Sequence, residues 1–463
     1  MKAASLLGLS VTAISSIAFG AGAGSPADVQ REALGNSRAY TFVRSLCDEV
    51  GPRLAGSPGD QAAVAWAQRT MRDMGLANVH TEPVKVTHWV RGEAHAEIVA
   101  PTRQPLVVAA LGGSVSTPAR GIEADVVEAE DIAALKKLDD ATVRGKIVFL
   151  DPKTRRARDG RGYGESVGNR HSGAREAAAK GAVAFLLRSI GTDSDRLPHT
   201  GAKGKDDHEI PALALAAPDA ELLHRMLAER KTARVHLSTT SHTLPDADGA
   251  NVVGEVPGRE RPNEVVLVGA HLDSWDLGTG AIDDGAGVGI ALETARVVAA
   301  MPEKPRRTVR VVLFANEEHG LEGAKGYAKA HTAEAGSIVV ATEADFGADA
   351  VYAVRFRGDP AARDRFATLA RALAPLGVAR EDEPAFGGAD VSPLMALGVP
   401  ALDLRQDGTR YFDFHHSAND TVDKIDPPTL ALAAAAFATA IREAADMEGD
   451  FGRIPEDQRK ARF

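Results

Sequence analysis

The stretch from Asn263 to Gly285, NEVVLVGAHLDSWDLGTGAIDDG, decides the fold that we expect for this chain. Its first part, Asn263 to Ala270, is an almost unbroken apolar run rich in Val and Leu, which is typical of a strand buried on both faces. The run passes directly into His271 and Asp273, and a helix is expected over Gly285 to Ala300. Polar side chains immediately after a buried strand predict a functional site at the carboxyl end of that strand.

The same strand and helix pattern continues after this stretch. Thr308 to Phe314 and Ile338 to Thr342 predict two more buried strands, and Gly320 to His331 and Ala361 to Leu376 predict helices. A last helix is expected from Pro427, because proline suits the first helical position. Strands that alternate with helices predict an α/β fold, with a mainly parallel, mixed sheet sandwiched by helices.

Acidic and histidine side chains follow each of the three predicted strands. They are His271, Asp273, Glu317, Glu318, Glu343 and Asp345. Asp283-Asp284 stands before the glycine-rich helix, and His415-His416 stands in a loop before the last helix. Because the carboxyl ends of parallel strands meet at one edge of a sheet, these side chains are expected to converge. Imidazole and carboxylate ligands without thiolate suit zinc, so the sequence predicts a metal site.

Each part of this set also has an ordinary interpretation when it is taken alone. Glu317-Glu318 fits a solvated turn, and Asp283-Asp284 fits a cap that accepts the free N–H groups of the following helix. A single His271 or Asp345 fits a polar residue at a strand end. The metal prediction therefore rests on the occurrence of all of these residues together.

The composition and the first residues restrict the possible partners and the location of the protein. The 463 residues carry a net charge of -10 and no long basic run, so a nucleic-acid partner has no support. Met1 to Ala23 has a positive start at Lys2, an apolar centre and an Ala-Gly-Ala cleavage site, which together predict a signal peptide. The alternative is an uncleaved membrane anchor, for which the apolar run is short. We expect an exported protein, periplasmic or secreted, without a membrane partner once the signal is removed.

Two further features concern cysteine usage and domain organisation. Cys47 is the single cysteine, so no intrachain disulfide is expected, and its amphipathic surroundings predict a buried, inert thiol.

The length predicts more than one structural unit. Residues 116–247 are interpreted as an inserted domain, and residues 24–115 and 248–463 as the main domain built from both flanks.

The quoted motifs resemble a known family. The segment from His271 to Gly285 closely resembles the metal-binding segment of the carboxypeptidase Q (plasma glutamate carboxypeptidase) family, within the co-catalytic zinc aminopeptidase superfamily. Asn316 to Gly320, Thr342 to Asp345 and Phe414 to Thr421 match the later motifs of that family in order. The resemblance runs from about Asn36 to Met447, and it implies a zinc-exopeptidase fold whose insertion is a protease-associated domain.

The resemblance also implies roles for individual residues. It assigns His271 and Asp345 to one zinc ion, Glu318 and His416 to a second, and Asp283 to both. Glu317 is implied as the general base that activates the water shared by the two ions.

Three further positions carry expectations of their own. Asp273 is expected to orient His271, as ligating histidines usually require, and the peptide bond between Asp283 and Asp284 is expected to be cis. His415 occupies the place where many relatives of the wider superfamily carry tyrosine. We consider it a candidate for stabilising the oxyanion, with packing against Phe412 and Phe414 as the alternative.

The predicted function is a two-zinc exopeptidase that hydrolyses dipeptides or short peptides, and a homodimer is possible. The alternatives are a glutaminyl cyclase-like transferase and a catalytically inactive binding protein on the same fold. Gly164 to Gly168 fits G-x-S-x-G but lacks the preceding buried strand of a serine hydrolase. Gly285 to Gly289 opens a helix, but its glycines favour close packing over dinucleotide binding.

Overall fold

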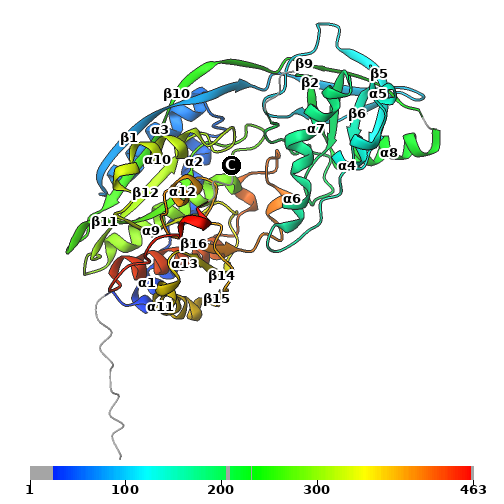
Figure 1. Cartoon of the computed structure of the whole chain (residues 1–463). Helices are drawn as coiled ribbons and strands as arrows, with labels where there is room; N and C mark the ends of the chain where they lie inside the picture. Colours follow the sequence, from blue (N-terminus) through cyan, green and yellow to red (C-terminus); the bar gives the residue numbers. More distant parts are fainter. Residues whose placement is uncertain (1–23, 205–208, 231, 460–463) are drawn as a thin grey trace, which may run out of the picture.

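The computed structural model describes residues 24–204, 209–230 and 232–459. Two sheets organise these residues, and each is surrounded by its own helices in a separate lobe (Figure 1). The predicted signal peptide, residues 1–23, lies outside the described residues. Within the described ranges, none of the helices combines the length and the apolar character needed to cross a bilayer.

The first sheet has eight strands in the order β1-β10-β12-β11-β13-β16-β14-β15. Their bounds are β1 Ala77–Val90, β10 His242–Val256, β11 Arg261–His271, β12 Arg307–Phe314, β13 Ile338–Glu343, β14 Val351–Arg357, β15 Ala379–Arg380 and β16 Ala401–Gln406. The central strands β12, β11, β13 and β16 are parallel, and β14 is parallel to β15. The pairs β1–β10, β10–β12 and β14–β16 are antiparallel. The predicted α/β class with a mainly parallel, mixed sheet is confirmed.

Helices cover both faces of the first sheet. They are α1 Pro26–Gly35, α2 Ala39–Glu49, α3 Pro58–Asp73, α9 Ala286–Ala300, α10 Glu322–Ala330, α11 Arg363–Leu373, α12 Ser392–Ala396 and α13 Pro427–Asp446. Along β11, Val266 and Val268 join the core shared with α2, α3, α9 and α13, and Val265 and Leu267 join the core shared with α10 and α12. This alternation explains why the strand is apolar at nearly every position.

Most of the elements predicted around β11 are present. The strands expected at 263–270, 308–314 and 338–342 correspond to β11, β12 and β13, and the helix expected at 285–300 corresponds to α9. Helix α13 begins at Pro427, as predicted, and the Asp426 side chain accepts the N–H of Thr429. Cys47 is buried, as expected, and its Sγ lies 3.7 Å from the carbonyl oxygen of Thr279.

The second sheet also has eight strands, in the order β3-β2-β9-β5-β6-β7-β8-β4. Their bounds are β2 Ala94–Ala100, β3 Gln104–Leu106, β4 Val108–Ala110, β5 Ile122–Ala129, β6 Ile147–Leu150, β7 Ala184–Arg188, β8 Ala212–Leu215 and β9 Arg234–Thr239. Its helices are α4 Ile132–Lys137, α5 Asp140–Val143, α6 Arg161–Ser166, α7 Gly168–Ala179 and α8 Ala217–Arg230.

The two lobes are joined by the long antiparallel pair of β1 and β10, which runs from one toward the other (Figure 1). Strands β2, β3 and β4 lie before residue 116 in the chain but pair within the second sheet. This sheet therefore begins earlier than the predicted insertion at 116–247, because its edge strands come from the segment between β1 and β5. The assignment of the insertion as a protease-associated domain stays a prediction.

Helix α13 offers a matched test of core packing. Leu430 is 0% exposed and Leu432 is 39% exposed, so two identical side chains differ only in burial. Leu430→Ala is expected to lower the free energy of unfolding by about 2–5 kcal/mol, because it leaves a cavity in the core. Leu432→Ala is expected to change the same quantity by less than about 0.5 kcal/mol. Urea denaturation followed by circular dichroism measures both values, and equal losses would contradict the packing described.

Candidate metal centre

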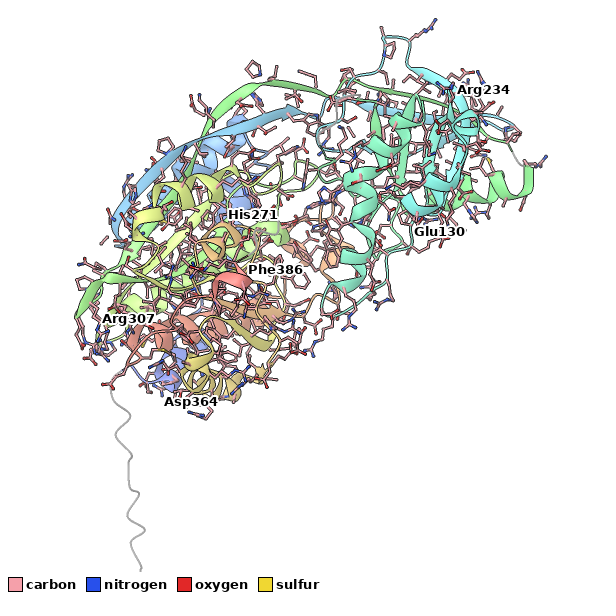
Figure 2. The ribbon with its side chains drawn as sticks, viewed as in Figure 1. Glu130, Arg234, His271, Arg307, Asp364 and Phe386 are labelled. Atoms are coloured by element: carbon pink, nitrogen blue, oxygen red, sulfur yellow. The ribbon has the colours of Figure 1, made fainter. Side chains whose placement is uncertain are left out.

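The predicted site residues lie at one edge of the first sheet. Strand β11 ends at His271, and the segments that follow β12 and β13 carry Glu317-Glu318 and Asp345. These strands are parallel, so their carboxyl ends place the side chains together. Figure 2 labels His271 within the first lobe.

The carboxylate of Asp283 lies between two groups of side chains. Its Oδ1 is 3.1 Å from Nε2 of His271, and its Oδ2 is 3.2 Å from Nε2 of His416. Nε2 of His271 is also 3.7 Å from Oδ1 of Asp345. Nε2 of His416 is 3.1 Å from Oε2 of Glu318. All five predicted ligands therefore converge, and the two oxygens of one carboxylate face different partners.

The donor atoms form two groups that are close enough to hold a metal ion. One contains His271, Asp283 and Asp345, and the other contains Asp283, His415 and His416. Both consist of imidazole nitrogens and carboxylate oxygens, which suit a divalent ion of zinc type. Within the described residues, Oε1 of Glu318 is buried and has no hydrogen-bond partner, so an acceptor is left over for a cation.

The electrostatics of the site also favour a cation. Burial raises the pKa of Glu317 well above its ordinary value, and the carboxylates of Asp345 and Glu318 add to this effect. Burial likewise raises the pKa of Glu318 and of Asp345. Several carboxylates that are desolvated together repel one another when ionised, and a bound cation relieves that repulsion.

Asp273 supports the ligand segment after β12. Its carboxylate accepts the N–H of Glu317 at 3.0 Å and the N–H of Glu318 at 3.4 Å. Nδ1 of His271 is 3.1 Å from the carbonyl oxygen of Asp273 and 3.6 Å from its carboxylate. The carboxylate is thus engaged mainly with the Glu317-Glu318 backbone, and the expectation that it orients His271 stays a prediction.

Two further carboxylates hold the segment that carries Asp283. Asp284 accepts the N–H of His271 at 3.0 Å and the N–H of Gly287 at 3.1 Å, so it also caps the start of α9. Asp420 accepts the N–H of Ile282 at 2.5 Å and the N–H of Asp283 at 3.3 Å. The peptide bond between Asp283 and Asp284 is cis, as the resemblance implied.

Some side chains that support the site stand outside any pattern in the sequence that would predict their role. Arg53 is buried and donates to the carbonyl oxygens of Leu272, Thr279 and Gly280, which fixes the loop after β11. Asp420 lies inside a quoted motif, but its spacing gave no indication of its role. Arg53 stands far from the motifs in sequence, and no local pattern could reveal its partners.

Loops of the second lobe hold the segment that carries the last two histidines. The N–H of Thr200 donates to the carbonyl oxygen of His416 at 2.9 Å, and Nδ1 of His199 donates to the carbonyl oxygen of His415 at 2.7 Å. Arg156 pairs with Asp413 at 2.6 Å. His416 is therefore positioned by both lobes together.

His415 is packed among several aromatic rings. Its ring stacks on His416 with centroids 3.5 Å apart, meets Tyr163 and Phe412 edge-on, and is tilted against Tyr411. Its Nε2 is 3.5 Å from Oδ2 of Asp283. The expected packing against Phe412 is thus present, whereas the oxyanion role stays a prediction.

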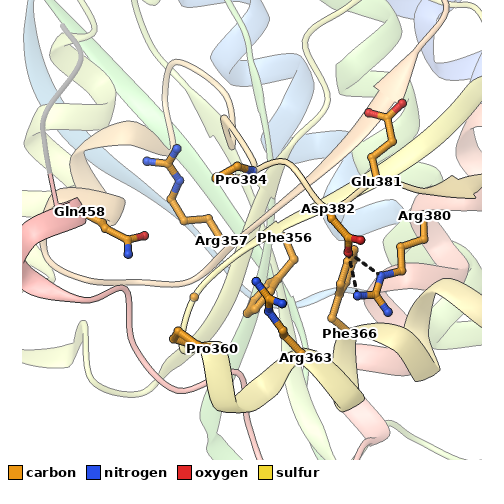
Figure 3. A pocket seen from close by; sticks show the side chains of 11 residues that line it. Phe356, Arg357, Pro360, Arg363, Phe366, Arg380, Glu381, Asp382, Pro384 and Gln458 are labelled. Atoms are coloured by element: carbon orange, nitrogen blue, oxygen red, sulfur yellow. Dashed lines mark hydrogen bonds and ion pairs between the residues drawn. The ribbon is translucent and has the colours of Figure 1, made fainter.

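A cavity of about 510 Å³ opens onto these side chains. It is lined by Asp283, Glu317, Glu318, Asp345 and His416 from the first lobe, and by Tyr163 and Arg170 from the second lobe. A separate hollow lies between Phe356, Arg363 and the ion pair of Arg380 with Asp382 (Figure 3). Of the predicted site residues, all but His271 and Asp273 line the first cavity, and none of them lines the second.

Comparisons with known proteins agree with this arrangement. The model of peptidase family M28 matches residues 251–441. The chain is 39% identical to carboxypeptidase Q of Rattus norvegicus, with 89% of this chain and 86% of the relative covered. A crystal structure of a peptidase M28 precursor from Shewanella amazonensis aligns with a TM-score of 0.91 and 45% identity, covering 93% of this chain and 98% of that one. A zinc aminopeptidase from Bacillus subtilis aligns with a TM-score of 0.66 and 19% identity over 91% and 98%, which shows a shared fold.

The contacts of Asp273 predict how this residue affects metal binding. Asp273→Asn is expected to weaken binding of a divalent metal by about 10–100-fold, because its uncharged amide holds the Glu317-Glu318 backbone less well. Titration of the metal-free protein with a metal salt measures this affinity. Asp248→Asn, at a position 87% exposed and paired with Lys85, serves as the control. Unchanged affinity in Asp273→Asn would contradict the supporting role.

Proposed function

The chain is a metallo-exopeptidase of peptidase family M28, and we propose that it uses two zinc ions to hydrolyse dipeptides or short peptides. One observation carries this proposal. The two oxygens of the Asp283 carboxylate face His271 and His416 separately, at 3.1 and 3.2 Å. A carboxylate placed in this way suits a ligand shared by two neighbouring cations.

The proposed ligands divide into two groups. His271 and Asp345 hold one zinc ion, Glu318 and His416 hold the other, and Asp283 binds both. The mixture of imidazole and carboxylate donors supports zinc, and so does the fold shared with the zinc aminopeptidase of Bacillus subtilis. Among the described residues, Oε1 of Glu318 is buried without a hydrogen-bond partner, so it would be available to hold the second ion.

Glu317 is the proposed general base. Zinc, when bound, acidifies a water molecule and polarises the peptide carbonyl. Glu317 lines the cavity beside the ligands, and Asp273 fixes its backbone, so its carboxylate can accept a proton from the attacking water. The water oxygen then bonds to the carbonyl carbon, the carbon–nitrogen bond breaks, and Glu317 returns the proton to the leaving amine.

The alternative functions gain no support from the comparisons. Curated relatives at 35–39% identity are carboxypeptidase Q proteins rather than glutaminyl cyclases. A binding protein without activity would show no metal-dependent hydrolysis. Release of amino acids from dipeptides, assayed before and after chelation, therefore separates the peptidase from both alternatives.

Export and assembly belong to the same proposal. The N-terminal pattern predicts a signal peptide, and we propose that the mature protein acts on short peptides in the periplasm or outside the cell. A homodimer stays a prediction.

The general-base role yields a sharp test. Glu317→Gln is expected to lower turnover by about 10²–10⁴-fold, because glutamine cannot accept the proton. The variant should retain the zinc content of the parent, because Glu317 is not among the ligands. Turnover is measured by dipeptide hydrolysis, and zinc by elemental analysis.

The matched control for this change is Glu334→Gln, at a position 61% exposed and paired with His331. This control should keep parental turnover. Near-parental turnover in Glu317→Gln itself would remove that residue from the proposed mechanism.

Removal of the shared ligand gives a second test. Asp283→Ala is expected to lose zinc from both positions, because each ion loses a carboxylate oxygen, and the loss should abolish hydrolysis. Elemental analysis of the purified variant measures zinc per chain. Asp382→Ala, which removes a carboxylate 78% exposed beside Arg380, is the control and should keep its zinc. One fully occupied position in Asp283→Ala would contradict the bridging role.

A further inference from the structure

Helix α6 brings a tyrosine from the second lobe to the candidate metal centre. The ring of Tyr163 stacks on Phe412, with centroids 4.5 Å apart and planes at 15°. It also meets the edge of His415 at 4.9 Å and 78°. Two aromatic rings from the first lobe thus fix the ring of Tyr163, and Tyr163 lines the cavity.

The side chain of Tyr163 lies near a cation and keeps its hydroxyl proton. The Arg170 Cζ lies 5.6 Å from the centre of the Tyr163 ring, and Arg170, Glu318 and Asp283 line the same cavity as Tyr163. Burial raises the pKa of Tyr163 to about 12, so the hydroxyl keeps its proton. Tyr163 is therefore a hydrogen-bond donor next to two proposed metal ligands.

Arg170 is a buried cation whose hydrogen-bond partners are uncharged groups. It is 5% exposed, and it donates to the carbonyl oxygens of Ala202 at 3.2 Å and Thr200 at 3.4 Å. Its Nη1 is 3.4 Å from Nδ1 of His416. Across the parts of the chain that the structure describes, no carboxylate forms an ion pair with it. Because buried charges are normally compensated, this guanidinium favours negative charge that arises in the cavity.

We propose that Tyr163 is a catalytic residue, whose hydroxyl donates a hydrogen bond to the substrate carbonyl oxygen as attack on the carbonyl carbon makes that oxygen negative. Arg170 is the positioning residue that holds this hydroxyl and stabilises the same charge through it. The proposal rests on the proposed peptidase function. The O–H bond of Tyr163 stays intact, because the tyrosine donates a hydrogen bond without transferring its proton.

Two neighbouring side chains fit this role less well. Nε2 of His415 is turned toward Asp283 Oδ2 at 3.5 Å, so its polar edge already faces a proposed ligand. The hydroxyl of Tyr411 is influenced by the carboxylates of the site, which disfavour negative charge beside it. Tyr163 combines a donor with an adjacent cation.

The test removes one oxygen atom and leaves the ring in place. Tyr163→Phe is studied as the full-length, zinc-loaded enzyme, with dipeptide hydrolysis as the first readout. We expect kcat to fall about 10²–10³-fold, the size of effect seen when an oxyanion donor is removed. KM should stay within about twofold, because the hydrogen bond forms only as charge develops.

A second readout is independent of turnover. A phosphinic pseudodipeptide carries a tetrahedral, negatively charged centre in place of the peptide bond, and calorimetry gives its Kd. Tyr163→Phe should weaken this Kd by at least about tenfold, because the analogue loses the donor that serves the transition state. Zinc content and melting temperature should equal those of the parent.

Tyr327→Phe is the matched control. The hydroxyl of Tyr327 also lies beside a cation, since it accepts a hydrogen bond from Arg310 at 3.0 Å, but Tyr327 does not line the cavity. This control should keep the parental kcat and the parental Kd of the pseudodipeptide.

The outcomes separate this proposal from the peptidase function. Parental kcat and parental Kd in Tyr163→Phe would overturn the catalytic role while leaving the peptidase intact. A rise in KM alone would also overturn it, because Tyr163 would then serve ground-state binding. If the parent enzyme itself shows no zinc-dependent hydrolysis, the peptidase function fails, and the phosphinic Kd alone decides the donor role.

Discussion

The two-sided contact of Asp283 is the constraint on which the rest of the site depends. One oxygen faces His271 and the other faces His416, and these histidines come from segments that are far apart in the chain. A carboxylate can serve both sides only if its backbone is held in place. Asp420 provides that hold by accepting the N–H of Asp283, and Asp284 ties the same segment to His271 and to the start of α9. Asp284 and Asp420 thus hold the backbone of the segment that carries Asp283.

Several buried carboxyl groups lie around Asp283, and the cost of ionising them links folding to metal binding. Glu317, Glu318 and Asp345 all have their pKa raised by burial, so the ionised forms are costly when no cation is near. The core behind them along β11 is apolar, so it supplies no polar group that compensates their charge. The fold therefore holds a set of charges that a divalent cation compensates, which couples metal binding to stability.

The second lobe takes part in the site directly. Its loops hold the backbone of His415 and His416, and its helices bring Tyr163 and Arg170 to the cavity. The acidic groups of the first lobe thus face a phenol and a guanidinium of the second lobe. A cavity with ligands on one side and hydrogen-bond donors on the other suits a small polar substrate held between them.

The sequence by itself determined the central strands, the helix at 286–300 and the set of residues that converge on the cavity. It could do so because buried parallel strands are apolar at nearly every position and because their carboxyl ends lie at one edge of the sheet. The limits of the second sheet, the partners of Arg53 and Asp420, and the approach of Tyr163 and Arg170 were decided by the tertiary structure alone. Each depends on contacts between segments that are more than a hundred residues apart, as with Arg53 and Leu272 or Arg170 and His416. Local periodicity carries no record of such contacts, because they arise only when segments that are distant in the sequence pack together in the folded chain.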